Sequence, residues 1–190
     1  MKKSILIPLI ILIVGIGLAL AGFGAGGLNS IWFDRGGAHL EERGELVRVD
    51  ETYPKFANIE IDADYLHSIV IKEGAVFGLK GANYERYGGI DANLDGDTLV
   101  ISATRKNKGG WLMDFGIGDF RNNDSFLEIT CPKGAKLGTV SANLGAGDTL
   151  VSGLNCGDLT IDNAFGSVDA SRVTCENLAI TADAGKVGLD

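Results

Sequence analysis

The sequence predicts an all-β, stacked-repeat β-solenoid of the β-helix-like, two-sheet kind, preceded by one N-terminal transmembrane helix. Two observations carry this prediction: self-similarity at a fixed offset through residues 137–190, and a long uncharged run near the N-terminus. The composition agrees, because 28 Gly residues lie among regularly placed Val, Ile and Leu. Such a composition suits many tight turns between short strands.

The repeat is marked by Gly147, Gly166 and Gly185, which are nineteen residues apart. The positions that keep the same offset are Leu137/Cys156/Cys175, Leu159/Leu178, Ile161/Ile180, Val168/Val187 and Ala170/Leu189. Each copy contains two short strands with one apolar face. One copy cannot bury that face alone, whereas stacked copies form a continuous core. We therefore expect Ile161 and Ile180 to point inward in adjacent rungs, with Asp162 facing outward.

The N-terminal run, residues 5–28, is long enough to cross a bilayer, which takes about 20 apolar residues. Lys2 and Lys3 precede it, so the positive-inside rule predicts a single-pass protein with a cytoplasmic N-terminus and an extracytoplasmic β-domain at the cell membrane. The alternative is a cleaved signal peptide, because Ala19-Leu20-Ala21 has the form of a cleavage site. Both alternatives export the domain.

The domain organisation follows from these patterns. Residues 1–28 are the anchor, 29–45 are a linker of mixed charge, and 46–190 are the β-strand-repeat domain, whose repeats are clearest in 137–190. Before the repeats, alternating apolar residues predict strands at 46–50, 57–63, 67–72, 76–80, 89–94, 97–103 and 126–131. Asp95-Gly96 predicts a hairpin between two of them.

One long segment, residues 105–124, interrupts the strand pattern and contains apolar side chains that need burial. A loop of this length is often functional. It either closes an end or an edge of the solenoid, or forms an exposed interaction loop that touches a membrane surface or a partner. The residues of this candidate interaction loop are Trp111, Leu112, Met113, Phe115 and Phe120.

The three cysteines are Cys131, Cys156 and Cys175. Since Cys156 and Cys175 share an apolar repeat position, we expect them to stack inside the solenoid as small hydrophobic residues, although the strand spacing would also admit a disulfide. No Cys-x-x-Cys is present and the only histidines are His39 and His67, so no metal site is predicted.

The acidic residues of the repeats, namely Asp148, Asp158, Asp162, Asp169 and Asp183, are expected at solvated turns. They match neither a calcium-binding nonapeptide nor an EF-hand loop. No pair is singled out for catalysis and no nucleophile motif occurs, so no catalytic residue, cofactor or enzymatic activity is predicted. The net charge of -8 argues against a nucleic-acid partner.

Five segments are to be taken together: the membrane segment, Phe56 to Ile61, Asp97 to Ile101, Ile129 to Gly134 and Gly157 to Ile161. In their order and spacing they resemble the bacterial putative-adhesin, β-strand-repeat family of unknown function. The resemblance covers about residues 46–190 and implies a solenoid domain tethered to the membrane, with a role in adhesion or in the envelope-stress response.

These features predict a membrane-anchored, extracytoplasmic binding or structural module of a bacterial cell envelope, adhesin-like, with a protein, envelope or glycan partner. The first alternative is an envelope-stress sensor or regulator that binds peptides or lipids. The second is a polysaccharide-acting enzyme.

The last rung, from Leu178 to Leu189, is expected to present unpaired strand edges and an apolar face. We therefore expect self-association, or binding of another β-rich protein, through the C-terminal rung. A truncated form of the sequence would present the same edge.

Overall fold

The computed structural model describes Leu12, Gly15 and residues 31–34, 37–40, 44–104 and 124–190. The chain divides into two units. In the first, β1 (Ile31–Asp34) and β2 (Gly37–Leu40) form an antiparallel hairpin in which Ile31 lies opposite Leu40. This hairpin occupies part of the segment that the sequence predicts to be a linker.

Two sequence predictions concern residues that are mostly not described. Of the predicted membrane segment, residues 1–28, the structure describes Leu12 and Gly15, both helical. Among the described residues, no helix has the length and apolar character that a membrane span requires. The candidate interaction loop, from Trp111 to Phe120, lies entirely outside the described residues.

The second unit is the β-domain, and the strands expected from the sequence are all present, within four residues at their ends. Their bounds are β3 (Leu46–Tyr53), β4 (Asn58–Ala63), β5 (Ser68–Gly74), β6 (Phe77–Tyr84), β7 (Asp91–Asp95), β8 (Thr98–Ala103), β9 (Phe126–Pro132), β10 (Lys136–Ala146), β11 (Asp148–Ser152), β12 (Asn155–Phe165), β13 (Val168–Ser171), β14 (Thr174–Ala184) and β15 (Val187–Leu189), with the 3₁₀ turn η1 at Glu85–Tyr87.

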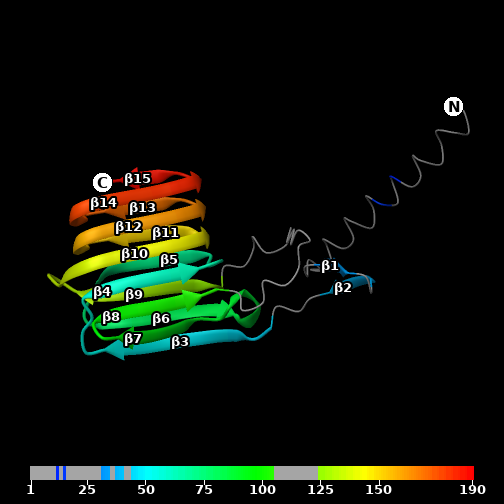
Figure 1. The fold of residues 1–190 in the computed structure, drawn as a ribbon, viewed down its shortest axis with the longest axis horizontal. Helices are drawn as coiled ribbons and strands as arrows, with labels where there is room; N and C mark the ends of the chain where they lie inside the picture. Colours follow the sequence, from blue (N-terminus) through cyan, green and yellow to red (C-terminus); the bar gives the residue numbers. More distant parts are fainter. Residues whose placement is uncertain (1–11, 13–14, 16–30, 35–36, 41–43, 105–123) are drawn as a thin grey trace, which may run out of the picture. The chain divides into compact units, whose positions relative to one another are not determined.

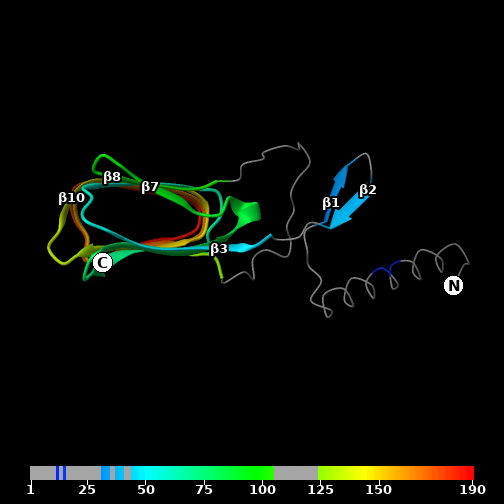
Figure 2. The same ribbon diagram turned by 90° about the horizontal axis from the view of Figure 1, so that it is seen from below.

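These strands form two sheets. The six-stranded sheet has the order β14-β12-β10-β4-β8-β7, and the seven-stranded sheet has the order β15-β13-β11-β5-β9-β6-β3. Figure 2 shows the sheets as the two long sides of a flattened ring. Figure 1 shows the successive rungs stacked on one another, with the C-terminal rung at one end of the stack. The predicted two-sheet solenoid is therefore confirmed for the β-domain.

The nineteen-residue repeat sets the register of the last rungs. Ile161 pairs with Ile180 in the parallel ladder between β12 and β14, and Val168 pairs with Val187 between β13 and β15. Because partner residues in a parallel pair point to the same side of the sheet, each apolar position continues from one rung to the next. The predicted stacking is confirmed.

The core lies between the sheets and follows the alternation of each strand. In β4, Ile59, Ile61 and Ala63 are buried while Glu60 and Asp62 are exposed. The buried apolar residues that continue this core into β10 and β12 are Leu137, Val140, Ala142, Leu144, Leu159 and Ile161. Burial of this apolar surface is the main term that stabilises the domain.

Rung order differs from chain order at the N-terminal end of the stack. β8 and β9 are later in sequence than β4 and β5, yet they pair with β4 and β5 on the side away from β10 and β11. Antiparallel strands complete this end: β7 pairs with β8 through the predicted Asp95-Gly96 hairpin, and β6 joins β9 to β3. The repeat in 137–190 contains no information about this arrangement.

The repeated glycines lie at one corner of the ring, where each rung turns from one sheet to the other. Gly147 has φ of 138°, and a Cβ placed there would meet the carbonyl oxygen of Leu66. A Cβ on Gly166 would meet the carbonyl of Gly147, and one on Gly185 would meet the carbonyl of Gly166. Only glycine therefore allows successive rungs to approach closely at this corner.

Candidate binding face

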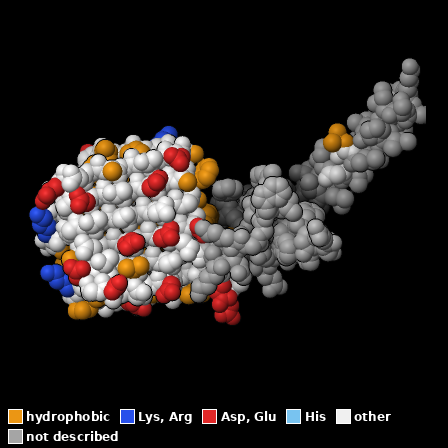
Figure 3. Space-filling model, viewed as in Figure 1, with side chains coloured by type: hydrophobic (Ala, Val, Ile, Leu, Met, Phe, Trp, Pro, Cys, Tyr) orange, Lys and Arg blue, Asp and Glu red, His pale blue; other side chains and the backbone are white. Residues whose placement is uncertain are grey.

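The outward side of the six-stranded sheet is a regular polar surface of the described β-domain. We call it the acidic face. Its residues are Asp91, Asn93 and Asp95 of β7, Thr98, Val100 and Ser102 of β8, Asn58, Glu60 and Asp62 of β4, Thr139, Ser141 and Asn143 of β10, Asp158, Thr160 and Asp162 of β12, and Asn177, Ala179 and Thr181 of β14. None of these positions is Lys or Arg, but Lys136 begins β10 in the same sheet, and its Nζ lies 3.4 Å from Glu176 Oε1 of β14. Figure 3 shows Asp and Glu side chains spread over such a face, with Lys and Arg only near its border.

One row crosses all six strands of this face at a single register. Its order is Asp91, Ser102, Asp62, Asn143, Asp162 and Thr181. We call it the acidic row. Carboxylates alternate along it with hydroxyl or amide side chains, so no two acids are direct neighbours, an arrangement that avoids repulsion between like charges. With strands about 4.8 Å apart, the carboxylates recur about every 10 Å.

Asparagine side chains hold acidic groups of the face in place. Asn143 Nδ2 donates to Asp62 Oδ1 at 3.3 Å, and Asn177 Nδ2 donates to Asp158 Oδ1 at 2.6 Å. Each amide lies one rung from the carboxylate that it binds. Hydrogen bonds to ionised carboxylates are stronger than neutral ones, so these amides fix the carboxylates without neutralising their charge.

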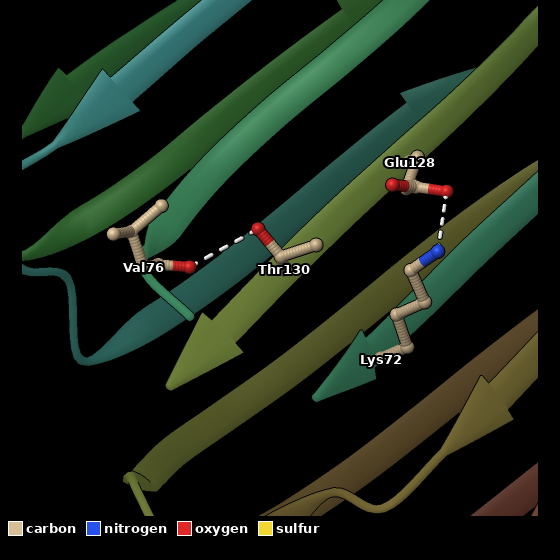
Figure 4. Close-up of polar contacts among 4 residues, drawn as sticks. All are labelled: Lys72, Val76, Glu128 and Thr130. Carbon is tan, nitrogen blue, oxygen red and sulfur yellow. Dashed lines mark hydrogen bonds and ion pairs between the residues drawn. The ribbon is translucent and has the colours of Figure 1, made fainter. Parts of the chain in front are cut away.

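The opposite face has a different charge pattern, because acidic side chains there pair with lysines inside the strands, whereas the Lys136–Glu176 pair of the six-stranded sheet lies near the first residues of β10 and β14. Lys72 Nζ lies 2.7 Å from Glu128 Oε2, and Lys80 Nζ lies 3.3 Å from Asp50 Oδ2. Figure 4 shows the first pair on adjacent strands, beside Thr130, whose hydroxyl donates to the Val76 carbonyl at 3.1 Å. Ion pairs at such exposed positions stabilise a protein by only about 0–1 kcal/mol, but they cancel charge locally. The two faces therefore differ in electrostatic potential.

The sequence predicts the repeat acids near turns, and three of them lie within two residues of a strand end: Asp148 is the first residue of β11, Asp169 is the second residue of β13, and Asp183 is the last residue but one of β14. The prediction is wrong for Asp158 and Asp162, which lie inside β12. Asp162 is exposed on the outward side of that strand.

The predicted cysteine positions are described in full. Cys131 and Cys156 are buried, Cys175 is half-buried, and all three are free thiols. Burial raises the pKa of the Cys131 thiol to about 12. Within the described part of the chain, no group of three or more His, Cys, Asp or Glu side chains is arranged to hold a metal ion.

The last rung leaves apolar side chains accessible. Leu178 is 45% exposed, whereas Leu159, its partner one rung earlier, is 1% exposed. Val187 and Leu189 of β15 are also exposed. In the described structure β14 and β15 are edge strands. Self-association through this rung stays a prediction, and these residues are the ones that it would bury.

Sequence reasoning missed the acidic row. The alternation of apolar and polar residues around Asp62 and Asp162 predicts that both side chains point outward. It does not predict their alignment, because Asp62 and Asn143 are 81 residues apart and are joined by pairing between β4 and β10, which lies outside the repeat.

Comparison with known proteins gives matches of low sequence identity among solved structures. One is a putative cell adhesion protein from Clostridium sporogenes, with 8% identity and a TM-score of 0.46, covering 76% of this chain and 99% of that chain. Another is a putative adhesin from Bacteroides fragilis, with 12% identity and a TM-score of 0.35, covering 77% and 97%. No curated protein sequence matches the chain. A family model, Toastrack DUF4097, matches residues 56–190, which include every strand of the two sheets except β3. The chain belongs to the Toastrack DUF4097 family.

Proposed function

We propose that the chain is a membrane-anchored, extracytoplasmic binding module of a bacterial cell envelope, adhesin-like in action, that presents the acidic face to its partner. The observation that carries this proposal is the acidic face itself: six strands in register hold a regular array of mostly polar side chains in which carboxylates recur, and the single Lys or Arg of these strands is Lys136, the first residue of β10. A surface of one charge sign attracts complementary partners and orients them.

The membrane anchor is supported by the sequence. The uncharged run of residues 5–28 follows Lys2 and Lys3, which favours a cytoplasmic N-terminus and an exported β-domain. In this arrangement the solenoid is held at the membrane by its N-terminal segment, and the acidic face is accessible from outside the cell.

The location is tested by labelling intact protoplasts with an amine-reactive reagent that cannot cross the membrane. Lys80 and Lys136 are suitable reporters, because their side chains are 61% and 65% exposed. We expect both to be labelled in intact protoplasts as fully as in lysed ones, while a cytoplasmic protein in the same sample is labelled only after lysis. Labelling of Lys80 and Lys136 that appears only after lysis would place the domain in the cytoplasm and contradict the proposal.

A second candidate is an envelope-stress sensor that binds cationic peptides, and the acidic row favours it. Carboxylates about 10 Å apart match basic residues at every third position of a peptide in the polyproline II conformation, which has three residues per turn and rises about 3.1 Å per residue. The two candidates differ in the probe that binds. An adhesin-like module is retained on isolated envelope glycan or on another cell surface, whereas a peptide sensor binds a lysine-rich peptide with an affinity that falls as salt increases.

A further inference from the structure

Two thiols are stacked at the C-terminal end of the solenoid. Cys156 of β12 and Cys175 of β14 are partners in the parallel ladder. Adjacent strands are about 4.8 Å apart, which is inside the range of about 4.4–6.8 Å that disulfides span between Cα atoms. Cys156 belongs to the core and Cys175 packs against it, so both side chains point to the interior.

Neighbouring side chains show how closely atoms one rung apart approach in this part of the molecule. Asn177, two residues after Cys175, places its Nδ2 2.6 Å from Asp158 Oδ1 on β12. In the other sheet, Ser171 Oγ lies 3.3 Å from Ser152 Oγ, at the same nineteen-residue offset. The spacing of these rungs therefore brings side chains of in-register residues within hydrogen-bond reach.

The position of β14 in its sheet also favours bond formation. In the described structure β14 is an edge strand that pairs with β12 and with no strand on its other side. A small movement of β14 toward β12 is therefore opposed by fewer contacts than the same movement would be in the middle of the sheet. Any strain that remains would make the bond easier to reduce.

We propose that Cys156 and Cys175 form a thiol–disulfide exchange site, which reacts with a low-molecular-weight disulfide to give a reversible cross-link between the last two rungs. The proposal rests on the register of β12 and β14 and does not depend on the proposed binding function.

The reaction takes place in two exchange steps. The Cys175 thiolate attacks one sulfur of the donor, the donor S–S bond breaks, and a mixed disulfide forms on Cys175 as one donor thiolate leaves. The Cys156 thiolate then attacks Cys175 Sγ and displaces the second donor thiolate. Two cysteine thiols lose two electrons, and the donor gains them. The two protons released by the cysteines convert the leaving groups to thiols.

The order of the steps follows from exposure. Cys175 is half-buried and is the sulfur that a donor from solution reaches first, whereas Cys156 is 1% exposed. Burial, together with Cys175 and Asp158, raises the pKa of the Cys156 thiol to about 11. Cys156 is therefore mostly a neutral thiol at neutral pH, and its small thiolate fraction attacks the mixed disulfide on Cys175, so the second exchange step is the slower one. Cys131, which pairs with Glu73, has no cysteine in register and is an internal control.

The test is to incubate the reduced full chain with oxidised glutathione, quench with acid, and count alkylatable thiols by mass. We expect a decrease from three thiols to one. The mass should fall by two hydrogen atoms with no glutathione attached, peptide mapping should join Cys156 to Cys175, and dithiothreitol should restore all three thiols.

Two variants serve as controls. Cys156→Ala should keep one glutathione on Cys175, because the resolving thiol is missing, and Cys131→Ala should form the same cross-link as the wild type. The wild-type measurement alone decides the proposal. A wild-type chain that retains glutathione on Cys175, keeps three thiols, or joins two chains through Cys175 would overturn it.

Discussion

Ile161→Asp is expected to unfold the β-domain. Ile161 is 1% exposed and packs in line with Ala142 and Ile180 on the neighbouring strands. An unpaired carboxylate at this position would lose its hydration without gaining a partner, at a cost of several kcal/mol. That is comparable with the total stability of an ordinary domain, about 5–15 kcal/mol. Circular dichroism with heating should show loss of the cooperative transition or a large drop in its midpoint.

The matched control is Asp162→Ala, one residue further along β12. Asp162 is exposed on the outward side, so its removal should change stability by no more than about 0.5 kcal/mol. Similar melting temperatures for the two variants would contradict the inward and outward assignment of β12, and with it the register of the whole stack.

Gly147→Ala is expected to destabilise the domain by about 2–5 kcal/mol, which combines backbone strain with steric overlap. Gly147 has φ of 138°, and the added Cβ would meet the Leu66 carbonyl oxygen, which belongs to the rung below. The clash is with backbone, so it is relieved only if the rungs move apart at this corner. Denaturant unfolding measures the effect as a shift of the midpoint.

Gly96→Ala separates the two causes. Gly96 also has a positive φ, 62°, but a Cβ there would have no atom within 4 Å. Its cost is therefore the conformational one alone, about 1–2 kcal/mol. If Gly147→Ala is no more destabilising than Gly96→Ala, close packing of the rungs is not what requires glycine at the corner.

These variants also show which part of the fold the sequence could predict. The register of the last rungs could be predicted because Ile161 and Ile180, like the corner glycines, recur at an offset of nineteen residues. The hairpin at Asp95-Gly96 could be predicted because this dipeptide favours a tight turn between two strands. Both features depend on residues that are close in sequence or related by the repeat.

The remainder depends on long-range pairing. β8 and β9 lie on the far side of β4 and β5 because Ile59 pairs with Leu99 and Ile69 pairs with Leu127, contacts that no local period encodes. The acidic row arises in the same way, since its members come from strands on both sides of β4.

The alternation of apolar and polar residues also fails where a polar residue occupies an inward position. Asn163 is buried in phase with Leu144 and Ala182, and its Nδ2 donates to the Gly147 carbonyl at 2.9 Å.

The central claim is that the acidic face binds the partner, and it is tested by neutralising the acidic row with Asp62→Asn, Asp91→Asn and Asp162→Asn together. The control is Asp50→Asn, Glu128→Gln and Asp169→Asn on the opposite face. Each set changes the net charge from -8 to -5, since -8 + 3 = -5. The replaced side chains are exposed or half-buried and their shapes are kept, and the two ion pairs that the control set removes, Lys80–Asp50 and Lys72–Glu128, stabilise the protein by only about 0–1 kcal/mol each, so both variants should melt close to the wild type.

The measurement is binding of the full chain, wild type and both variants, to isolated envelope glycan, to a second cell surface and to a lysine-rich peptide. We expect the acidic-row variant to lose at least about tenfold in affinity for the probe that the wild type binds, a change of about 1.4 kcal/mol, and the control variant to bind like the wild type. Equal loss in both variants would show an effect of net charge alone, and unchanged binding by the acidic-row variant would contradict the assignment of the binding surface to this face.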